Sequence, residues 1–261
     1  MNSIISTNTI FHYTKSMKKL ESILKNDFYP QFCFEDIFGT ILDTRESEMP
    51  IPMVCFCDIP LSQVSKHIQT YGDYAVGMSK EWAIKNKINP VLYTYPNSDF
   101  STKLKEMIFT ISKYAKENQG SKDELTKHFL SAILYVKPYE GRLWKNGKWS
   151  KKKIRFYDER EWRYVLRIPG SDRPLFLAGV DSRTKEAREK LKKFNEVIIN
   201  NSDLRLSFQP NDIKYLIVKN ENEILAMLDK VTKIKRHKFS HEAVQILTTR
   251  IISMENIREN F

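Results

Sequence analysis

Residues 156–164, FYDEREWRY, predict the strand around which the rest of the chain is arranged. Side chains alternate between the two faces of a strand, so Trp162 and Tyr164 share one face while Glu161 and Arg163 share the other. A strand that begins near Glu161 therefore has a carboxylate at its first residue and an arginine on the same face. Two interpretations remain open: a functional site at the strand end, or an edge strand whose charges are solvated.

Length and composition predict one globular domain over residues 1–261. A chain of 261 residues can bury one substantial core, and 41% hydrophobic and 12% aromatic residues are typical of globular proteins. No apolar run approaches the roughly 18 residues of a membrane-spanning helix. The N-terminus lacks the basic and apolar regions of a secretory signal, so we expect a cytoplasmic protein that does not contact membranes.

The cysteines predict reduced thiols. There are three of them, Cys33, Cys55 and Cys57, and an odd count without a secretory signal is typical of the cytoplasm. Cys55 and Cys57 are two residues apart, so they face the same side of a strand. No second cysteine pair and no histidine pair at ligand spacing accompanies them, so we expect small buried side chains and no metal.

The charge distribution predicts a polyanionic partner. The formal net charge is +11, and the most basic stretch covers residues 137–155. Its cations are Arg142, Lys145, Lys148, Lys151, Lys152, Lys153 and Arg155. Trp144 and Trp149 are interleaved with them, a combination that suits single-stranded nucleic acid because phosphates pair with cations and bases stack on rings. The alternative is a solvated hairpin whose tryptophans pack on the core.

Strand and helix signals are mixed along the chain. Besides the strand at Glu161, strands are expected near residues 9–13, 53–57, 74–79, 90–95, 175–177, 204–208, 213–218 and 247–252. Helices are expected after Ser16, from Ser62 to Tyr71, over 80–86, 182–195 and 221–231, and after Ser240. Residues 30–52, with the acidic Asp43, Glu46 and Glu48, are expected to form a long loop that covers a site.

A pair of helices over about 101–136 is expected as an insertion between two sheet segments. Because strands and helices do not alternate regularly, the fold class predicted is α+β, with central mixed or antiparallel sheets and flanking helices. The chain contains no Walker loop, no Gly-x-Gly-x-x-Gly, no His-Glu-x-x-His and no Gly-x-Ser-x-Gly. The sequence therefore lacks the motifs that indicate ATP hydrolysis, dinucleotide binding of the Rossmann type, zinc proteolysis or esterase chemistry.

Several segments together resemble one bacterial family. They are residues 11–14 with the 20–24 helix, 56–62, 71–82, 89–93, 161–163 and 210–218. In these segments, which extend over nearly the whole chain, the sequence is similar to the AbiGi family of abortive phage-infection proteins. That resemblance implies a role in phage defence, in which the family has been described as the antitoxin of a two-gene system with a partner protein.

More distantly, His12-Tyr13-Thr14 and the late Glu161 resemble the His-Tyr-Glu pattern of ADP-ribosyltransferases, of which the DarT type modifies nucleic acid. This resemblance implies sheets of the ADP-ribosyltransferase type and NAD as substrate. It implies that His12 and Thr14 hold a ribose, while Tyr71 or Tyr74 stacks on nicotinamide. Arg45 and Arg163 are both candidates for the pyrophosphate.

The residue types suit that chemistry. Cleavage of the nicotinamide–ribose bond builds positive charge at the anomeric carbon, and a carboxylate such as Glu161 can stabilise it. We therefore expect His12 and Glu161 in one cleft on adjacent central strands, with Tyr71 or Tyr74 on its wall. Side chains on opposite surfaces would argue against the enzyme. A non-catalytic antitoxin that binds a partner protein or RNA would remain.

Overall fold

The computed structural model describes residues 7–36, 48–117, 124–145, 148–167, 182, 184–236 and 238–260. Its strands are β1 (Thr9–Thr14), β2 (Gln31–Asp36), β3 (Glu48–Cys57), β4 (Tyr74–Ser79), β5 (Asn89–Pro90), β6 (Leu92–Thr94), β7 (Val136–Pro138), β8 (Glu140–Lys145), β9 (Lys148–Arg155), β10 (Glu161–Val165), β11 (Ile213–Val218) and β12 (Ile251–Ser253). Its helices are α1 (Met17–Asn26), α2 (Ser65–Tyr71), α3 (Lys80–Lys85), α4 (Asp99–Glu117), α5 (Glu124–Ile133), α6 (Lys185–Asn200), α7 (Ile224–Lys235), α8 (His241–Thr248) and α9 (Met254–Asn260).

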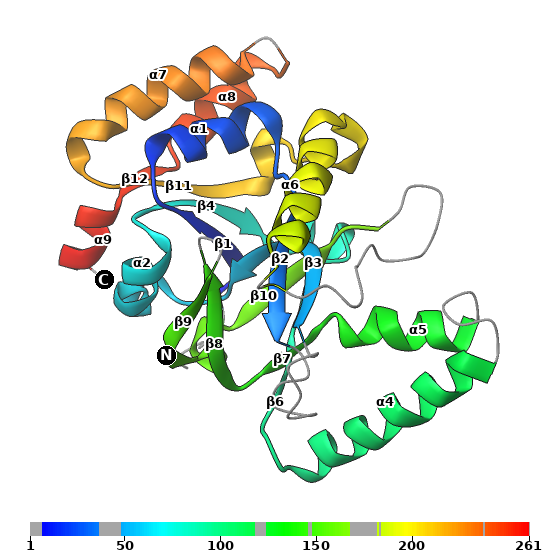
Figure 1. Ribbon diagram of the computed structural model, residues 1–261. Helices are drawn as coiled ribbons and strands as arrows, with labels where there is room; N and C mark the ends of the chain where they lie inside the picture. Colours follow the sequence, from blue (N-terminus) through cyan, green and yellow to red (C-terminus); the bar gives the residue numbers. More distant parts are fainter. Residues whose placement is uncertain are drawn as a thin grey trace.

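A central mixed sheet organises the described part of the chain. Its strands follow the order β12-β11-β4-β1-β3-β10-β5 (Figure 1). Strand β2 pairs with the first part of β3, residues 48–53. All neighbours are antiparallel except β11 and β12, which run parallel. The predicted α+β class with a mixed central sheet is confirmed.

Helices cover both faces of this sheet. On the first face, α1, α7 and α8 pack together (Figure 1), and they contribute Leu20, Met227 and Leu247 to the largest apolar cluster. On the second face, α2 and α9 pack through Ile68 and Ile257. Because both faces are covered, β1 and β4 are buried along almost their whole length.

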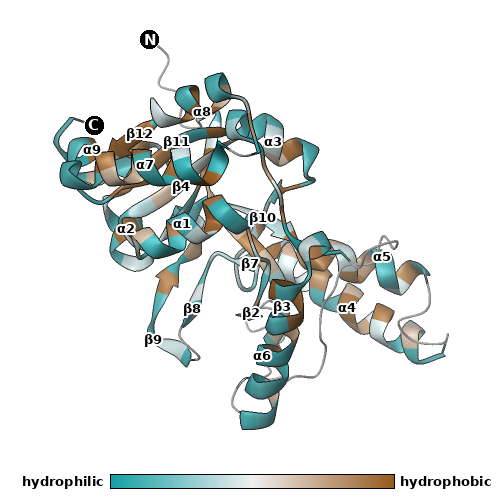
Figure 2. Cartoon of the chain, turned by 90° about the horizontal axis from the view of Figure 1, so that it is seen from above, coloured by the Kyte–Doolittle hydropathy of each residue, from teal (hydrophilic) through white to brown (hydrophobic). Residues whose placement is uncertain are grey.

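The expected helical insertion is present as α4 and α5. The two helices project from the rest of the molecule, and Figure 2 shows polar and apolar colours mixed along both of them, as amphipathic helices require. Leu104 and Ile108 of α4 meet Ile133 of α5 in an apolar cluster on the second face of the sheet. The ends of the insertion are held together because β6 and β7 pair in parallel beside it.

The cap predicted at Ser16 is confirmed, because its side chain accepts a hydrogen bond from the backbone N–H of Lys19. Ser240 likewise caps α8, although α9 and not α8 is the last helix. Ser62 caps nothing: α2 starts at Ser65 and its N-terminus has no side-chain cap. Gly72 ends α2 with φ of 111°, a backbone region that L side chains rarely adopt, and the chain enters β4 two residues later.

Three expected segments differ from the structure. The predicted loop over residues 30–52 is wrong at both ends, where β2 and β3 pair antiparallel. Alternate burial of Phe32 and Phe34 marks β2 as a strand. Residues 204–208 alternate in burial without a partner strand, and only Leu206 forms an isolated bridge with Phe28. The strand expected over 247–252 is shorter, because α8 extends to Thr248.

Several predicted features, including Asp43, Glu46, Arg45 and the strand at 175–177, lie outside the described residues. None of the described helices has both the length and the apolar character needed to cross a membrane.

Candidate functional site

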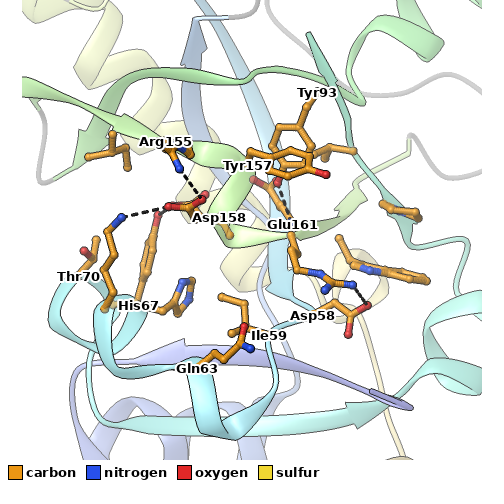
Figure 3. Close-up of a pocket in the computed structure, with 18 of the residues that line it drawn as sticks. Asp58, Ile59, Gln63, His67, Thr70, Tyr93, Arg155, Tyr157, Asp158 and Glu161 are labelled. Carbon is orange, nitrogen blue, oxygen red and sulfur yellow. Dashed lines mark hydrogen bonds and ion pairs between the residues drawn. The ribbon is translucent and has the colours of Figure 1, made fainter. Parts of the chain in front are cut away.

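A pocket of about 1090 Å³ opens on the second face of the sheet, at the start of β10. Its walls come from α2, from the end of β9, from the 3₁₀ helix Phe156–Glu159 and from the segment around β5 and β6. Tyr71, Tyr93, Tyr157, Glu159 and Glu161 are among the lining residues. Figure 3 shows aromatic rings and charged groups converging on this space from separate elements. The strand end predicted from FYDEREWRY therefore borders the pocket.

The geometry of β10 follows from the turn before it. Arg160 adopts a left-handed conformation with φ of 45° and ends the 3₁₀ helix, so that β10 starts at Glu161. In the register with β3, Glu161 lies opposite Cys57 and Arg163 opposite Cys55. These side chains share the second face of the sheet, as the alternation predicted. The backbone N–H of Glu161 also donates a hydrogen bond to the Tyr93 hydroxyl, at 2.8 Å.

Glu161 is part of a buried ionic network. Its Oε1 accepts from Nε of Arg163 at 2.7 Å, and its Oε2 pairs with Nζ of Lys137. Lys137 also reaches Oε2 of Glu159 at 3.1 Å. Arg163 also pairs with Glu35, at 3.3 Å between Nη2 and Oε2. Only 4% of the Glu161 surface is exposed. The alternative of a solvated edge strand is therefore wrong for this residue, and removal of one ion would leave a buried charge without its partner.

The carboxyl groups of Glu159 and Glu161 have pKa values shifted in opposite directions. Burial opposes ionisation of Glu161, but the Arg163 and Lys137 cations outweigh it and lower its pKa to about 2. For Glu159, burial is the dominant effect and raises the pKa despite the contact with Lys137. Tyr71 donates a hydrogen bond to Glu159, with 2.5 Å between the oxygens. Neighbouring carboxyl groups with pKa values pushed apart are common at functional sites.

His12 does not reach this pocket, which corrects the expected cleft. Strand β3 lies between β1 and β10, and in that register Phe11, Cys57 and Glu161 form one row. His12 therefore points to the opposite face, where its ring meets Phe28 and Phe56 edge-on. Its Nδ1 forms a hydrogen bond with the Cys55 carbonyl at 2.8 Å, and burial lowers its pKa.

Thr14 is two residues from His12 on β1, so its side chain lies on the same first face. Tyr74 of β4 pairs directly with Thr14 and shares that face. The Tyr74 hydroxyl donates to Glu223 at 2.9 Å, away from the pocket. Tyr71, in contrast, lines the pocket as predicted for one of the two tyrosines. Tyr13 faces the pocket side but is buried behind His67, with ring centroids 5.1 Å apart.

Arg163 cannot serve as a ligand-binding arginine in this arrangement. Its side chain is fully buried, and Nη1 donates to the Leu134 carbonyl at 2.8 Å while the remaining nitrogens face Glu161 and Glu35. Its Nε instead contacts Oε1 of the Glu161 carboxylate. Two other arginines line the pocket: Arg155, which is exposed, and Arg160, which is half-buried.

While Lys137 belongs to β7, most of the basic stretch forms the hairpin of β8 and β9. Its cations Lys148, Lys151, Lys152, Lys153 and Arg155 are exposed, and Lys145 is half-buried. Both tryptophans pack inward: the Trp144 ring meets Phe34 at 4.8 Å, and Trp149 contacts Trp144 and donates to the Ser182 hydroxyl. Trp149 is half-buried in this packing, and its stacking on bases stays a prediction.

The cysteines are free thiols: Cys57 is buried, and Cys33 and Cys55 are half-buried. Burial raises the pKa of Cys33 to about 12 and raises the pKa of the other two thiols as well. Across the described ranges, no group of three His, Cys, Asp or Glu side chains is arranged to hold a metal ion.

Sequence pattern did not identify the lysine at the centre of the network. Lys137 comes from β7, far from β10 in sequence, and is 3% exposed. Its one local signal is a lysine between the apolar Val136 and Pro138, all three of them buried. A lysine in such a position needs a carboxylate partner, but its identity follows only from the tertiary contacts.

Comparisons with known proteins agree on one family. A family model described as "Putative abortive phage resistance protein AbiGi, antitoxin" matches residues 26–219. The abortive phage resistance protein AbiGi of Lactococcus lactis subsp. cremoris is 28% identical over 235 residues, which cover 84% of this chain and 92% of that protein. No solved structure matches the chain significantly. With most of its length matched by that model, this chain belongs to the AbiGi family of putative abortive phage resistance proteins.

Proposed function

We propose that this chain serves in abortive phage resistance as an antitoxin-type protein that binds single-stranded nucleic acid without turning over a substrate. The observation that carries the binding is the row of exposed cations on β9, beside the mouth of the pocket. The description of the family model as antitoxin supports the non-catalytic role. The separation of His12 from Glu161 by the thickness of the sheet supports it as well.

The charges on β9 suit a phosphate backbone. Lys151, Lys152 and Lys153 are consecutive and exposed, and Arg155 follows on the same strand. Lys153 and Arg155 also line the pocket. Cations at this spacing neutralise phosphates and release condensed counterions, which makes affinity depend steeply on salt.

The buried network is a reason to favour binding over catalysis. Both carboxylate oxygens of Glu161 are engaged by Arg163 and Lys137, so stabilising a developing cation would compete with two existing ion pairs. A transferase also needs groups that hold the second ribose. The side chains proposed for that task, His12 and Thr14, face α1 and the first core.

The second candidate is transfer of ADP-ribose from NAD to nucleic acid in a fold of the ADP-ribosyltransferase type. It is favoured by the position of Glu161 and Tyr71 on one pocket of about 1090 Å³, a volume that can accommodate a dinucleotide. In this mechanism Glu161 stabilises the oxocarbenium-like transition state and Tyr71 stacks on nicotinamide. The raised pKa of Glu159 suits a second carboxyl group that carries a proton.

The binding proposal is tested by salt titration of affinity for single-stranded RNA and DNA. Replacing Lys151, Lys152 and Lys153 together by alanine should lower the slope of log K against log salt by about 2, because each single-strand phosphate contact contributes about 0.7. A matched control replaces Lys190, Lys192 and Lys193, three exposed lysines of α6, and should leave the slope unchanged. Equal effects of the two triple variants would contradict a site on β9.

The two candidates are separated by labelled NAD and by growth. We expect the purified chain to transfer no label to RNA, DNA or protein, and cells that express it alone to grow normally. Transfer that falls about 10²–10³-fold in Glu161→Gln would establish the transferase instead. Transfer unaffected by that change but lost in Glu159→Gln would move the catalytic role to Glu159. Thermal melts of each variant exclude unfolding as the cause.

A further inference from the structure

Four tyrosine rings form a continuous row from the pocket to the surface. Tyr93 meets Tyr157 edge-on with centroids 5.3 Å apart, and Tyr157 stacks on Tyr139 at 5.3 Å with 26° between the ring planes. Tyr139 then meets Tyr95 edge-on at 5.7 Å. Figure 3 shows the inner end of this row, where Tyr93 and Tyr157 lie beside Glu161 in the pocket. We call Tyr93, Tyr157, Tyr139 and Tyr95 the tyrosine row.

Main-chain hydrogen bonds hold three segments of the tyrosine row in fixed positions. The N–H of Tyr139 donates to the Thr94 carbonyl at 2.7 Å, and the N–H of Tyr157 donates to the Tyr139 carbonyl at 3.1 Å. Tyr93 is fixed through its hydroxyl, which accepts from Glu161. Rings on such a support need little further ordering when they bind a partner, so less affinity is lost to conformational entropy.

The outer part of the tyrosine row is open to solvent. Tyr95 is 59% exposed and Tyr157 54% exposed, values that packing in a core does not explain. The structural alternative, that the rings only cover one another, accounts for Tyr139, which is half-buried between them. It does not account for two large rings that present most of their surface to water beside a basic strand.

Two cations of β9 lie near the middle of the tyrosine row. The Arg155 guanidinium lies 5.9 Å from the Tyr139 ring centroid, and Lys153 lines the same pocket as Tyr157. Asp158 lies beside these cations, 3.8 Å from Arg155 and 3.1 Å from Lys66. Exposed rings with cations beside them match the two chemical features of single-stranded nucleic acid, flat bases and charged phosphates.

We infer that the tyrosine row is a base-stacking platform for single-stranded nucleic acid. Bases stack on the exposed rings of Tyr95 and Tyr157, phosphates pair with Lys153 and Arg155, and the row directs the strand towards the pocket. This inference rests on the proposed nucleic-acid binding and adds a contact that cations alone do not provide. The rings of Tyr95 and Tyr157 are more exposed than the two tryptophans of the hairpin, which are half-buried.

The test compares two strands with the same backbone. One is a twelve-nucleotide thymidine strand and the other is the same strand with abasic sugars in its central positions, a design that removes stacking and keeps the phosphates. Wild type should bind the base-containing strand more tightly, by roughly 5- to 150-fold for each base that stacks. The variant Tyr95→Leu with Tyr157→Leu should reduce that ratio towards one while the affinity for the abasic strand stays the same.

A matched control replaces Tyr215, which is 38% exposed on β11 outside the tyrosine row, by leucine and should keep the wild-type ratio. Equal, salt-dependent affinity of the wild type for both strands would overturn the stacking platform and leave the basic hairpin as the binding surface. Absence of binding to either strand at low salt would overturn the nucleic-acid proposal itself. Circular dichroism of the double variant verifies that the fold is intact before affinities are compared.

Discussion

At the scale of single residues, the site depends on how buried charges are compensated. Lys137 lies between Glu159 and Glu161, and all three side chains are almost inaccessible to water. The attraction between such charges is strong, but so is the cost of taking them out of water, so the network is sensitive to loss of any one member. The Lys137 ammonium also lies 4.4 Å from the Phe156 ring centroid, which adds a cation–π contact.

Replacement of Lys137 by methionine should therefore destabilise the fold strongly. The methionine side chain fills much of the same volume but leaves two buried carboxyl groups facing each other, and breaking a buried pair typically costs about 3–5 kcal/mol. Urea unfolding at pH 7 measures the loss of free energy. The exposed Lys151→Met is the control and should change it by less than about 0.5 kcal/mol. A loss below about 1 kcal/mol for Lys137→Met would show that the network contributes little.

At the scale of elements, the pocket depends on how α2 is joined to β4. Gly72 provides this turn with φ of 111° and ψ of 170°. A Cβ built at Gly72 would lie 2.6 Å from Cα of Lys15 and even closer to the Thr14 carbonyl oxygen. Both contacts are with backbone, which cannot move away as a flexible side chain can. The turn in this way places Tyr71, the last residue of α2, against Glu159.

Gly72→Ala should destabilise the protein by about 1–3 kcal/mol, the cost of a non-glycine residue in this backbone region. Because the clash lies next to Tyr71, the substitution should also loosen the Tyr71–Glu159 hydrogen bond, and the near-UV circular dichroism should change. Chemical denaturation gives the free energy. Gln69→Ala, at an exposed position of the same helix, should have an effect within about 0.5 kcal/mol. Similar values for both variants would contradict the strain at Gly72.

At the scale of the whole molecule, the buried ionic network makes the free energy of unfolding depend on pH. The pKa of Glu161 is lowered from 4.5 to about 2 in the folded state. A carboxyl group with a lowered pKa adds stability above its unfolded pKa, and this contribution disappears as the pH falls from about 4.5 towards 2. Glu159 has a raised pKa and the opposite sign: its contribution is present below its unfolded pKa and is lost as the pH rises through the folded value.

We therefore expect stability to fall less steeply with acid in Glu161→Gln than in wild type between about pH 5 and 2. The variant should be less stable than wild type at pH 7, because glutamine leaves Arg163 and Lys137 short of one negative charge. Urea midpoints at a series of pH values measure both effects. Glu189→Gln, at an exposed position of α6, serves as the control and should follow the wild-type curve. Parallel curves for Glu161→Gln and wild type would refute the linkage.

Much of the local structure could be predicted from the sequence alone. The sequence predicted strands at β1, β4, β10 and β11, with a period of two at β10, and a serine before a helical pattern predicted the start of α1. The placement of Glu161 and Arg163 on one face of β10 was also correct, because alternation within a strand needs no partner. The α+β class followed from the irregular order of these elements.

The composition of the site was decided by tertiary structure. Whether His12 and Glu161 share a face depends on the register of β1 and β10 with the strand between them, and a shift by one residue reverses every side chain. That register is set by burial of both sheet faces under helices far apart in sequence. Lys137 likewise reaches Glu161 only because β6 and β7 pair beside the helical insertion. Local patterns determined which faces each strand has, and long-range packing decided which residues meet there.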